Sequence, residues 1–192
     1  MKRFIILTVS LIVLLTVQAA NKREFRGAWI QCVNGQFNGL SRDDMQRTLS
    51  YQLDELQKDG VNTIIFQVRA ECDALYNSPY EPWSRYLTGV QGKAPSPYWD
   101  PLQWMVEQCH KRGMEIHAWI NPYRAKNTKN IIPQASNHIS VTHPERMFTY
   151  DRLYILNPGN PLNREYICKI ADDIVRRYDI DGFHIDDYFY PY

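Results

Sequence analysis

Two adjacent carboxylates, Asp186 and Asp187, follow an apolar stretch near the end of the 192-residue sequence. Acidic residues at the carboxyl end of a strand in an α/β protein often act as catalytic groups, because the sheet holds them rigidly. A carboxylate in that position suits nucleophilic or general acid–base chemistry. The sequence therefore predicts a catalytic centre that includes both residues.

Strand alternation selects the side chains that share this centre, since every second residue of a strand points to the same face. It places His184 and Asp186 on the inward face and leaves Asp187 in a supporting role. The other strands and their ends add polar or aromatic groups that suit substrate binding. The substrate-binding candidates are Gln67, Arg69, His117, Trp119, Asn121, Arg124, His184 and Tyr188.

Several of these residues also have a structural interpretation. Arg69 could pair with Glu71 or Asp73, and His117 could be a hydrogen-bonded core histidine. Asp186 could belong to a buried ion pair, although an inward-facing acid beside His184 is costly to bury without a partner or a function.

The candidates lie on short apolar strands that alternate with amphipathic helices, a pattern typical of parallel βα architecture. Helices are expected from about Ser41, from Asp100-Pro101 and from a cap at Asn163, each signalled by an N-capping side chain. The expected strands are Phe25–Val33, Val61–Val68, Glu115–Asn121 and Phe183–Phe189.

Connections from strand to helix are long, whereas those from helix to strand are tight. Residues 70–99 and 122–162 form the two long connections, and loops of this size inside a domain are usually functional. In parallel architecture both lie at the carboxyl ends of the strands, where barrel active sites are built. The glycine-rich turn of dinucleotide-binding sheets is missing after the first strand. A (β/α)8 TIM barrel is therefore favoured.

About four βα units are present, whereas a complete barrel takes about 250 residues. We therefore expect residues 21–192 to be the N-terminal half of a barrel, truncated at the C-terminus, with a second catalytic acid beyond residue 192. The 192-residue chain would then be inactive alone. A natural half-barrel that dimerises is the alternative.

Residues 1–20 read as a secretory signal peptide. Lys2 and Arg3 precede the apolar run Phe4–Val17, and Ala19-Ala20 supplies small residues for cleavage. The expected location is the periplasm, the cell envelope or the medium, with no stable membrane span after cleavage. An uncleaved N-terminal anchor is the alternative.

The amino-acid composition limits the classes of molecule that the protein is expected to bind. Removal of Lys2 and Arg3 from the 22 basic residues leaves 20 against 21 acidic ones, a net charge of −1 that gives no reason to expect nucleic acid. The wide spacing of the four cysteines argues against a metal site, and no cofactor is expected. Export permits disulfides, but the positions of Cys109 and Cys168 in expected helices and of Cys32 in a strand favour buried free thiols. Aromatic residues in the long connections suit sugar stacking: Tyr76, Tyr80, Trp83, Tyr86, Tyr98 and Trp99.

A set of linked motifs resembles the glycosyl hydrolase-like family 10 of bacterial envelope proteins. The motifs are Arg26-Gly-Ala-Trp29, Ile65-Phe-Gln-Val-Arg69, Glu81-Pro-Trp-Ser84, Leu87-Thr-Gly89, His117-Ala-Trp-Ile-Asn-Pro-Tyr-Arg124, Leu156-Asn-Pro-Gly159 and Asp181-Gly-Phe-His-Ile-Asp-Asp-Tyr-Phe-Tyr-Pro191. The resemblance implies a TIM barrel and a glycoside hydrolase. It also implies a polysaccharide substrate in the bacterial envelope, such as peptidoglycan glycan strands without peptides.

Gly182-Phe-His-Ile-Asp186 is also similar to the strand-four Gly-Phe-Arg-x-Asp of α-amylase-type barrels. Asp186 falls on the nucleophile of that motif, and His184 replaces its arginine.

Two other functions stay open. A metal-dependent hydrolase of the polysaccharide deacetylase type would use His117, His184 and Asp186 as ligands, and a glycan-binding protein would need no catalytic acid.

Overall fold

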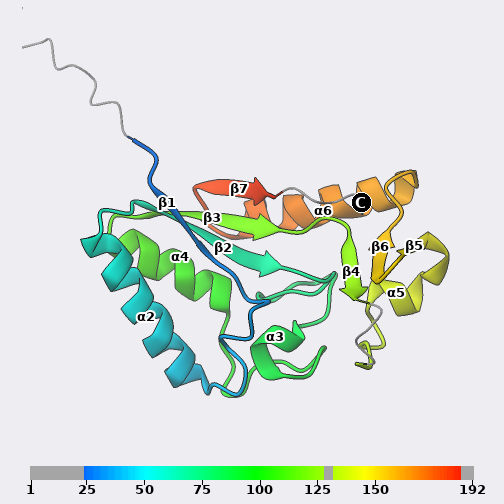
Figure 1. The fold of residues 1–192 in the computed structure, drawn as a ribbon, viewed down its shortest axis with the longest axis horizontal. Coiled ribbons are helices and arrows are strands. Elements are labelled where there is room, and N and C mark those ends of the chain that lie inside the picture. Colours follow the sequence, from blue (N-terminus) through cyan, green and yellow to red (C-terminus); the bar gives the residue numbers. More distant parts are fainter. Residues whose placement is uncertain (1–23, 128–131, 187–192) are drawn as a thin grey trace, which may run out of the picture.

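The computed structural model describes residues 24–127 and 132–186 of the chain. The principal layer is a parallel sheet with helices α2, α4 and α6 packed on it (Figure 1). The elements of this layer are β1 (Gly27–Ile30), α2 (Arg42–Lys58), β2 (Thr63–Arg69), α4 (Pro101–Lys111), β3 (Glu115–Ile120), α6 (Pro161–Arg177) and β7 (Gly182–Ile185). The predicted alternation of parallel strands with helices is confirmed.

The sheet has the order β1-β2-β3-β7, and all its neighbouring strands are parallel. Its strands therefore follow one another in space as they do along the chain, as in the first four strands of a barrel. β1 and β7 are the edge strands of this sheet. The described residues thus form a partial barrel.

One face of the sheet carries the core. Ile64, Phe66 and Val68 of β2 pack in a single cluster with Leu49 of α2 and Ile174 of α6. β2 is buried over its whole length, because helices cover one side and neighbouring strands and loops cover the rest. The parallel sheet is consequently the rigid part on which the strand ends are held.

Helix starts follow local capping chemistry. Ser41 caps α2 by accepting a hydrogen bond from the Asp44 N–H, and Asp100 caps α4, which begins with Pro101. The third helix differs from its expected start, because α6 begins at Pro161 with Asn160 as its cap. Asn163 instead lies buried in the first turn, where its amide donates to the carbonyl oxygens of Arg146 and Asn157.

The two long connections are themselves folded. Residues 70–99 contain the short helix α3 (Arg85–Thr88) and a turn held by backbone bridges at Ala74. The second connection contains an antiparallel sheet of order β4-β6-β5, which the sequence analysis did not foresee. Its elements are β4 (Arg124–Asn127), α5 (Ile139–Thr142), the 3₁₀ helix η1 (Pro144–Arg146), β5 (Met147–Tyr150) and β6 (Leu153–Leu156).

Figure 1 shows the antiparallel sheet and α5 gathered at the end of the molecule toward which the arrowheads of β2 and β3 point. β5 and β6 form a hairpin with a two-residue turn, in which Asp151 has a φ of +47°. Such turns require positive φ and favour Asp, Asn or Gly. The carboxyl-end face therefore carries ordered structure rather than open loops.

Two smaller predictions are corrected. β1 spans only Gly27–Ile30, so Cys32 lies in a bend after the strand and not within it. Cys32, Cys72 and Cys109 are buried free thiols as expected, but Cys168 is exposed because it lies on the outer side of α6.

Some predictions fall on other parts of the chain. The predicted signal peptide, Asp187 and Tyr188 lie outside the described residues. None of the helices within residues 24–127 and 132–186 combines the length and apolarity that a bilayer crossing requires.

Candidate active site

The inward face of the parallel sheet is built from two rows of paired residues. One row joins Trp29, Ile65, His117 and Gly182, each a register partner of the next. The register confirms that alternation correctly places Gln67, Trp119 and His184 together in the next row toward the carboxyl ends. These side chains point away from the face that packs on the helices.

Three rings on this face are in contact. Trp29 packs edge-on against Trp119, with ring centroids 4.8 Å apart, and against His184 at 4.5 Å. Trp29 is 50% exposed, whereas Trp119 is 7% exposed and its Nε1 donor is buried with no hydrogen-bond partner. An exposed indole over a buried one forms an aromatic platform of the kind that sugars stack on, although sequence reasoning had not chosen Trp29 as a site residue.

His117 occupies space that a side chain at position 182 would fill. A Cβ added to Gly182 would lie 2.5 Å from both Cδ2 and Nε2 of His117, which is far inside van der Waals contact. Phe25 packs on the other side of the imidazole, with centroids 5.7 Å apart. Glycine at position 182 is therefore needed for His117 to lie flat against β7.

Asp186 directly follows β7 and continues the inward phase of His184. It is partly buried, and its Oδ1 atom is sequestered from solvent. Burial and the neighbouring His117 lower the pKa of His184, whereas the charge of Asp186 acts in the opposite direction. His184 is thus held neutral beside a carboxylate at neutral pH, so the pair offers a nucleophile or base next to a hydrogen-bonding ring.

Gln67 is only 2% exposed and its amide oxygen holds the start of the loop after β1. Oε1 accepts hydrogen bonds from the Cys32 backbone N–H at 3.0 Å and from the Cys32 thiol at 3.3 Å. The structure therefore gives Gln67 a positioning contact, and its predicted role in substrate binding stays a prediction.

Arg69 does not share the inward face with Gln67, contrary to the alternation argument. A β-bulge lies between the two residues, so that Gln67 pairs with Trp119 while Arg69 pairs with Ile120 of the opposite phase. A bulge adds one residue to a strand and redirects the side chains beyond it. Arg69 is consequently fully buried, away from the row in which it was predicted.

The partner of Arg69 is Glu81 rather than Glu71 or Asp73. Its Nε and Nη2 atoms donate to the two carboxylate oxygens of Glu81 at 2.8 and 2.7 Å, and Nη1 donates to the carbonyl oxygens of Asn121 and Pro122. Tyr166 of α6 donates to Glu81 at 3.0 Å. This buried bidentate pair ties both long connections to α6 and has no donor directed at a substrate.

Asn121 is also an internal support. Its Oδ1 atom accepts from the backbone N–H groups of Tyr123 and Arg124, which shapes the turn after β3. Arg124 is partly buried at the start of β4 and lies near enough to Glu71 to oppose the rise in the pKa of that carboxyl. The structure therefore gives Asn121 a positioning contact, and direct contact of either residue with a ligand stays a prediction.

Sequence reasoning missed a layer of buried polar groups behind this face. Glu71 binds Arg85 at 2.8 Å, and burial raises the pKa of Glu71. Asp73 accepts from Gln91, while His138 contacts the Glu71 carbonyl oxygen through Nε2 at 2.8 Å. The only signal in the sequence was the repeated acid at every second position after β2, which by itself does not distinguish a binding loop from a support.

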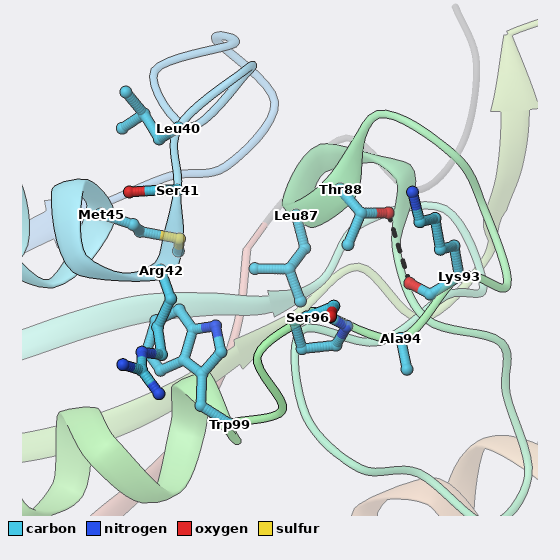
Figure 2. Close-up of a pocket in the computed structure, with 11 residues that line it drawn as sticks. Leu40, Ser41, Arg42, Met45, Leu87, Thr88, Lys93, Ala94, Ser96 and Trp99 are labelled. Atoms are coloured by element: carbon cyan, nitrogen blue, oxygen red, sulfur yellow. Dashed lines mark hydrogen bonds between the residues drawn. The ribbon is translucent and has the colours of Figure 1, made fainter.

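Two hollows lie near these elements. The larger, of about 750 Å³, is lined by Trp29, Gln31 and Trp119 together with residues of α2, beside the edge of β1. The smaller, of about 160 Å³, lies between the first turn of α2 and the 87–99 segment, and Figure 2 shows Leu87 and Trp99 among its lining residues. The smaller hollow shares no residue with the inward face, so the reaction is not placed there.

Within the described residues, no group of three or more His, Cys, Asp and Glu side chains has an arrangement suited to a metal ion. His117, His184 and Asp186, the ligands that a metal-dependent hydrolase would need, therefore do not form such a group. Among the described residues, the inward face carries a carboxylate, two imidazoles, an amide and aromatic rings.

The sequence model of one family, described as glycosyl hydrolase-like 10, matches residues 24–192. The chain belongs to glycosyl hydrolase-like family 10. The resemblance of the motifs is thereby confirmed, and the family 10 match covers all of the described residues.

Two relatives of this family 10 chain carry glycosyl hydrolase names. It is 42% identical to glycosyl hydrolase YngK of Bacillus subtilis over 91% of its own length, and 40% identical to glycosyl hydrolase DigH of Escherichia coli over 76%. In both cases it covers 35% of the relative. The family 10 chain thus spans about a third of the length of these curated relatives.

Solved structures of glycosidases share the fold. A maltogenic α-amylase of Thermotoga neapolitana matches with a TM-score of 0.54 at 14% identity, over 87% of the family 10 chain and 40% of the amylase. A chitobiase of Flavobacterium johnsoniae matches with a TM-score of 0.55 at 16% identity, over 85% and 23% respectively. At such low identity these likenesses show the fold alone, which is that of a partial TIM barrel.

Proposed function

We propose that the complete protein is a glycoside hydrolase that cleaves O-glycosyl bonds of a bacterial envelope polysaccharide, with Asp186 as nucleophile or general base. The proposal depends on one observation. Asp186 follows β7 on the same face as the contacting rings of Trp29, Trp119 and His184, at the carboxyl end of the sheet. Family membership and the glycosidase names of the relatives support the same reaction class.

The proposed reaction needs two carboxyl groups. Asp186 attacks the anomeric carbon or activates a water there, and a protonated acid from a later part of the barrel protonates the leaving oxygen. His184, kept neutral by burial, donates a hydrogen bond to a sugar hydroxyl or to Asp186 itself. Trp29 stacks on a pyranose ring, and Arg124 and Asp187 orient the substrate around it.

The proposed substrate is peptidoglycan glycan freed of its stem peptides, reached by export through the signal at residues 1–20. This choice rests on the resemblance of the motifs to envelope proteins and on the open aromatic face, which suits a chain of pyranose rings better than a small charged metabolite.

The test is hydrolysis of peptide-free glycan strands by the complete protein, followed by mass spectrometry of the soluble products. Asp186→Asn is expected to lower the rate by at least about 10²–10⁴-fold with no change in the unfolding temperature, because it removes the charge and keeps the shape. Asp172→Asn is the matched control, since Asp172 pairs with Arg176 on the exposed side of α6. Both it and the wild type should release products equally.

Three results would contradict the proposal. Equal turnover by Asp186→Asn and Asp172→Asn would remove Asp186 from the chemistry. Release of acetate without new reducing ends, abolished by a chelator, would favour the metal-dependent deacetylase. Binding of the glycan without any cleavage would identify a glycan-binding protein.

A further inference from the structure

A separate polar cavity of about 160 Å³ lies among three segments at the carboxyl-end side of the sheet. Its walls come from the turn at Tyr80, from α5 with η1, and from α6. The first two of these walls belong to the long connections that leave β2 and β3. The lining residues that matter here are Tyr80, Ile139, Thr142, His143, Arg146 and Tyr166.

Among the described residues, no carboxylate is hydrogen-bonded to Arg146, a mostly buried cation. Its side chain is 18% exposed, and its Nε atom is inaccessible to water and has no hydrogen-bond partner. The nearest acid is Glu145, whose Oε1 atom lies 4.0 Å from that nitrogen but 3.1 Å from Nδ1 of His143. A guanidinium in this state is costly, because desolvation is offset only by charge-assisted hydrogen bonds.

The surrounding groups favour an anion with an apolar stem. No carboxylate lines the described cavity, and a second cation lies close to one of its lining residues, since the Nζ atom of Lys169 is 5.4 Å from the centre of the Tyr80 ring. The Tyr166 hydroxyl is committed to Glu81, so that this residue contributes its ring to the wall beside Ile139. The cavity thus joins positive charge to apolar surfaces that suit alkyl or sugar groups.

The residue that carries the charge is held in place. The Arg146 carbonyl oxygen accepts a hydrogen bond from the Asn157 backbone N–H at 3.0 Å and another from the Asn163 side chain at 2.9 Å. Because Asn163 lies in the first turn of α6, the backbone that carries this cation is anchored to the helix that forms the opposite wall. Binding of a ligand then has to order the Arg146 side chain but not its backbone.

We propose that this cavity binds the carboxylate of an acidic sugar, such as the lactyl ether carboxylate of N-acetylmuramic acid. A planar carboxylate can accept hydrogen bonds from the two Nη groups of a guanidinium, and the ring or short stem that carries it fits against Tyr80 and Tyr166. The proposal deepens the proposed function, on which its choice of sugar rests. It assigns recognition of the free acid, which peptide-free wall glycan exposes, to Arg146.

Binding is measured by titration calorimetry or ligand-observed NMR on the complete protein carrying Asp186→Asn, so that no hydrolysis intervenes. N-acetylmuramic acid and N-acetylglucosamine form the matched probe pair, since they differ by the lactyl carboxylate. The acidic sugar is expected to bind about tenfold more tightly, and Arg146→Gln should abolish this difference. Arg47→Gln, on the exposed surface of α2, is the control that should retain it.

Equal affinities for the two sugars would overturn the proposal, as would a preference that survives Arg146→Gln. Competition by inorganic phosphate as strong as that by the acidic sugar would show a general anion site instead and would also contradict it. If Arg146→Gln lowers the unfolding temperature markedly, Tyr80→Ala at the half-exposed rim replaces it and should weaken binding of the acidic sugar several-fold. Loss of hydrolysis with the preference intact would refute only the catalytic assignment.

Discussion

The polar groups at the carboxyl ends of the strands fall into two regions that differ in burial and partners. Behind the sheet, Arg69 and Glu81 are fully buried and saturate one another with hydrogen bonds. On the inward face, Trp29 and His184 are partly open and touch one another through their rings. Polar residues at strand ends can either hold loops in place or bind a ligand. Buried groups whose hydrogen bonds are all made within the protein do the first, and partly exposed groups are free to do the second.

The largest effect is expected from breaking the buried pair. Glu81→Ala leaves the Arg69 guanidinium without its partner in a water-free site, and should lower the free energy of unfolding by about 3–5 kcal/mol. Urea unfolding followed by circular dichroism measures this loss. The exposed pair of Arg47 and Asp44 is the control, and Arg47→Ala should leave the unfolding midpoint unchanged. Similar midpoints for both variants would show that the buried pair does not hold the loops.

A smaller loss is expected at the contact between β7 and β3. Gly182→Ala places a Cβ 2.5 Å from the His117 ring and should cost about 1–3 kcal/mol of stability, with reduced hydrolysis by the complete protein. The double variant Gly182→Ala with His117→Ala removes the clash. If the double variant does not regain stability over Gly182→Ala alone, the close approach of His117 is not the cause.

The buried layer should also give a pH dependence. Burial lowers the pKa of His138, whose Nδ1 accepts from the Ser140 N–H and whose Nε2 donates to the Glu71 carbonyl, so the folded protein holds the ring neutral. The contribution of His138 to stability is therefore fully present above about pH 6.5, the pKa of histidine in the unfolded chain. It is lost as the pH falls through the lower pKa of His138 in the folded protein, by at most about 1.4 kcal/mol per pH unit.

Unfolding of the wild type and of His138→Gln between about pH 5 and pH 7 isolates this contribution. Burial raises the pKa values of Asp73 and Glu71, so these carboxyl groups make the protein less stable as the pH rises, opposite to His138. The quantity to compare is therefore the difference in the free energy of unfolding between wild type and His138→Gln at each pH. Parallel curves for the two proteins would mean that His138 is not held neutral by the fold.

The smallest change in energy is expected on the open face, and it should appear in binding rather than in stability. Trp29→Ala removes a half-exposed ring from the platform, and should weaken binding of a glycan fragment by about 0.5–1.5 kcal/mol. Calorimetric titration of the Asp186→Asn protein with and without the change measures the difference. Unchanged affinity would move the substrate away from this platform.

The sequence predicted the parallel βα order, the caps at Ser41 and Asp100 and the inward row of Gln67, Trp119 and His184, because these depend on periodicity and local capping. It did not predict the redirection of Arg69, since a bulge changes the phase of a strand without a distinctive residue. Trp29 was missed because the first strand has no charged side chain in the inward phase that would mark it as part of a site. The pairing of Arg69 with Glu81 depends on how residues 70–99 fold back, which no local pattern specifies.

The antiparallel sheet between β3 and α6 also bears on the rate at which the chain folds. Strands β5 and β6 are neighbours along the chain and close with a two-residue turn, so they can pair within microseconds and at little entropic cost. β7, by contrast, must find β3 across the whole intervening segment. Early formation of the hairpin shortens the flexible part of that segment, and so lowers the loop-closure entropy that slows parallel pairing. The insert would thereby act as an internal folding aid during synthesis, before β7 has emerged.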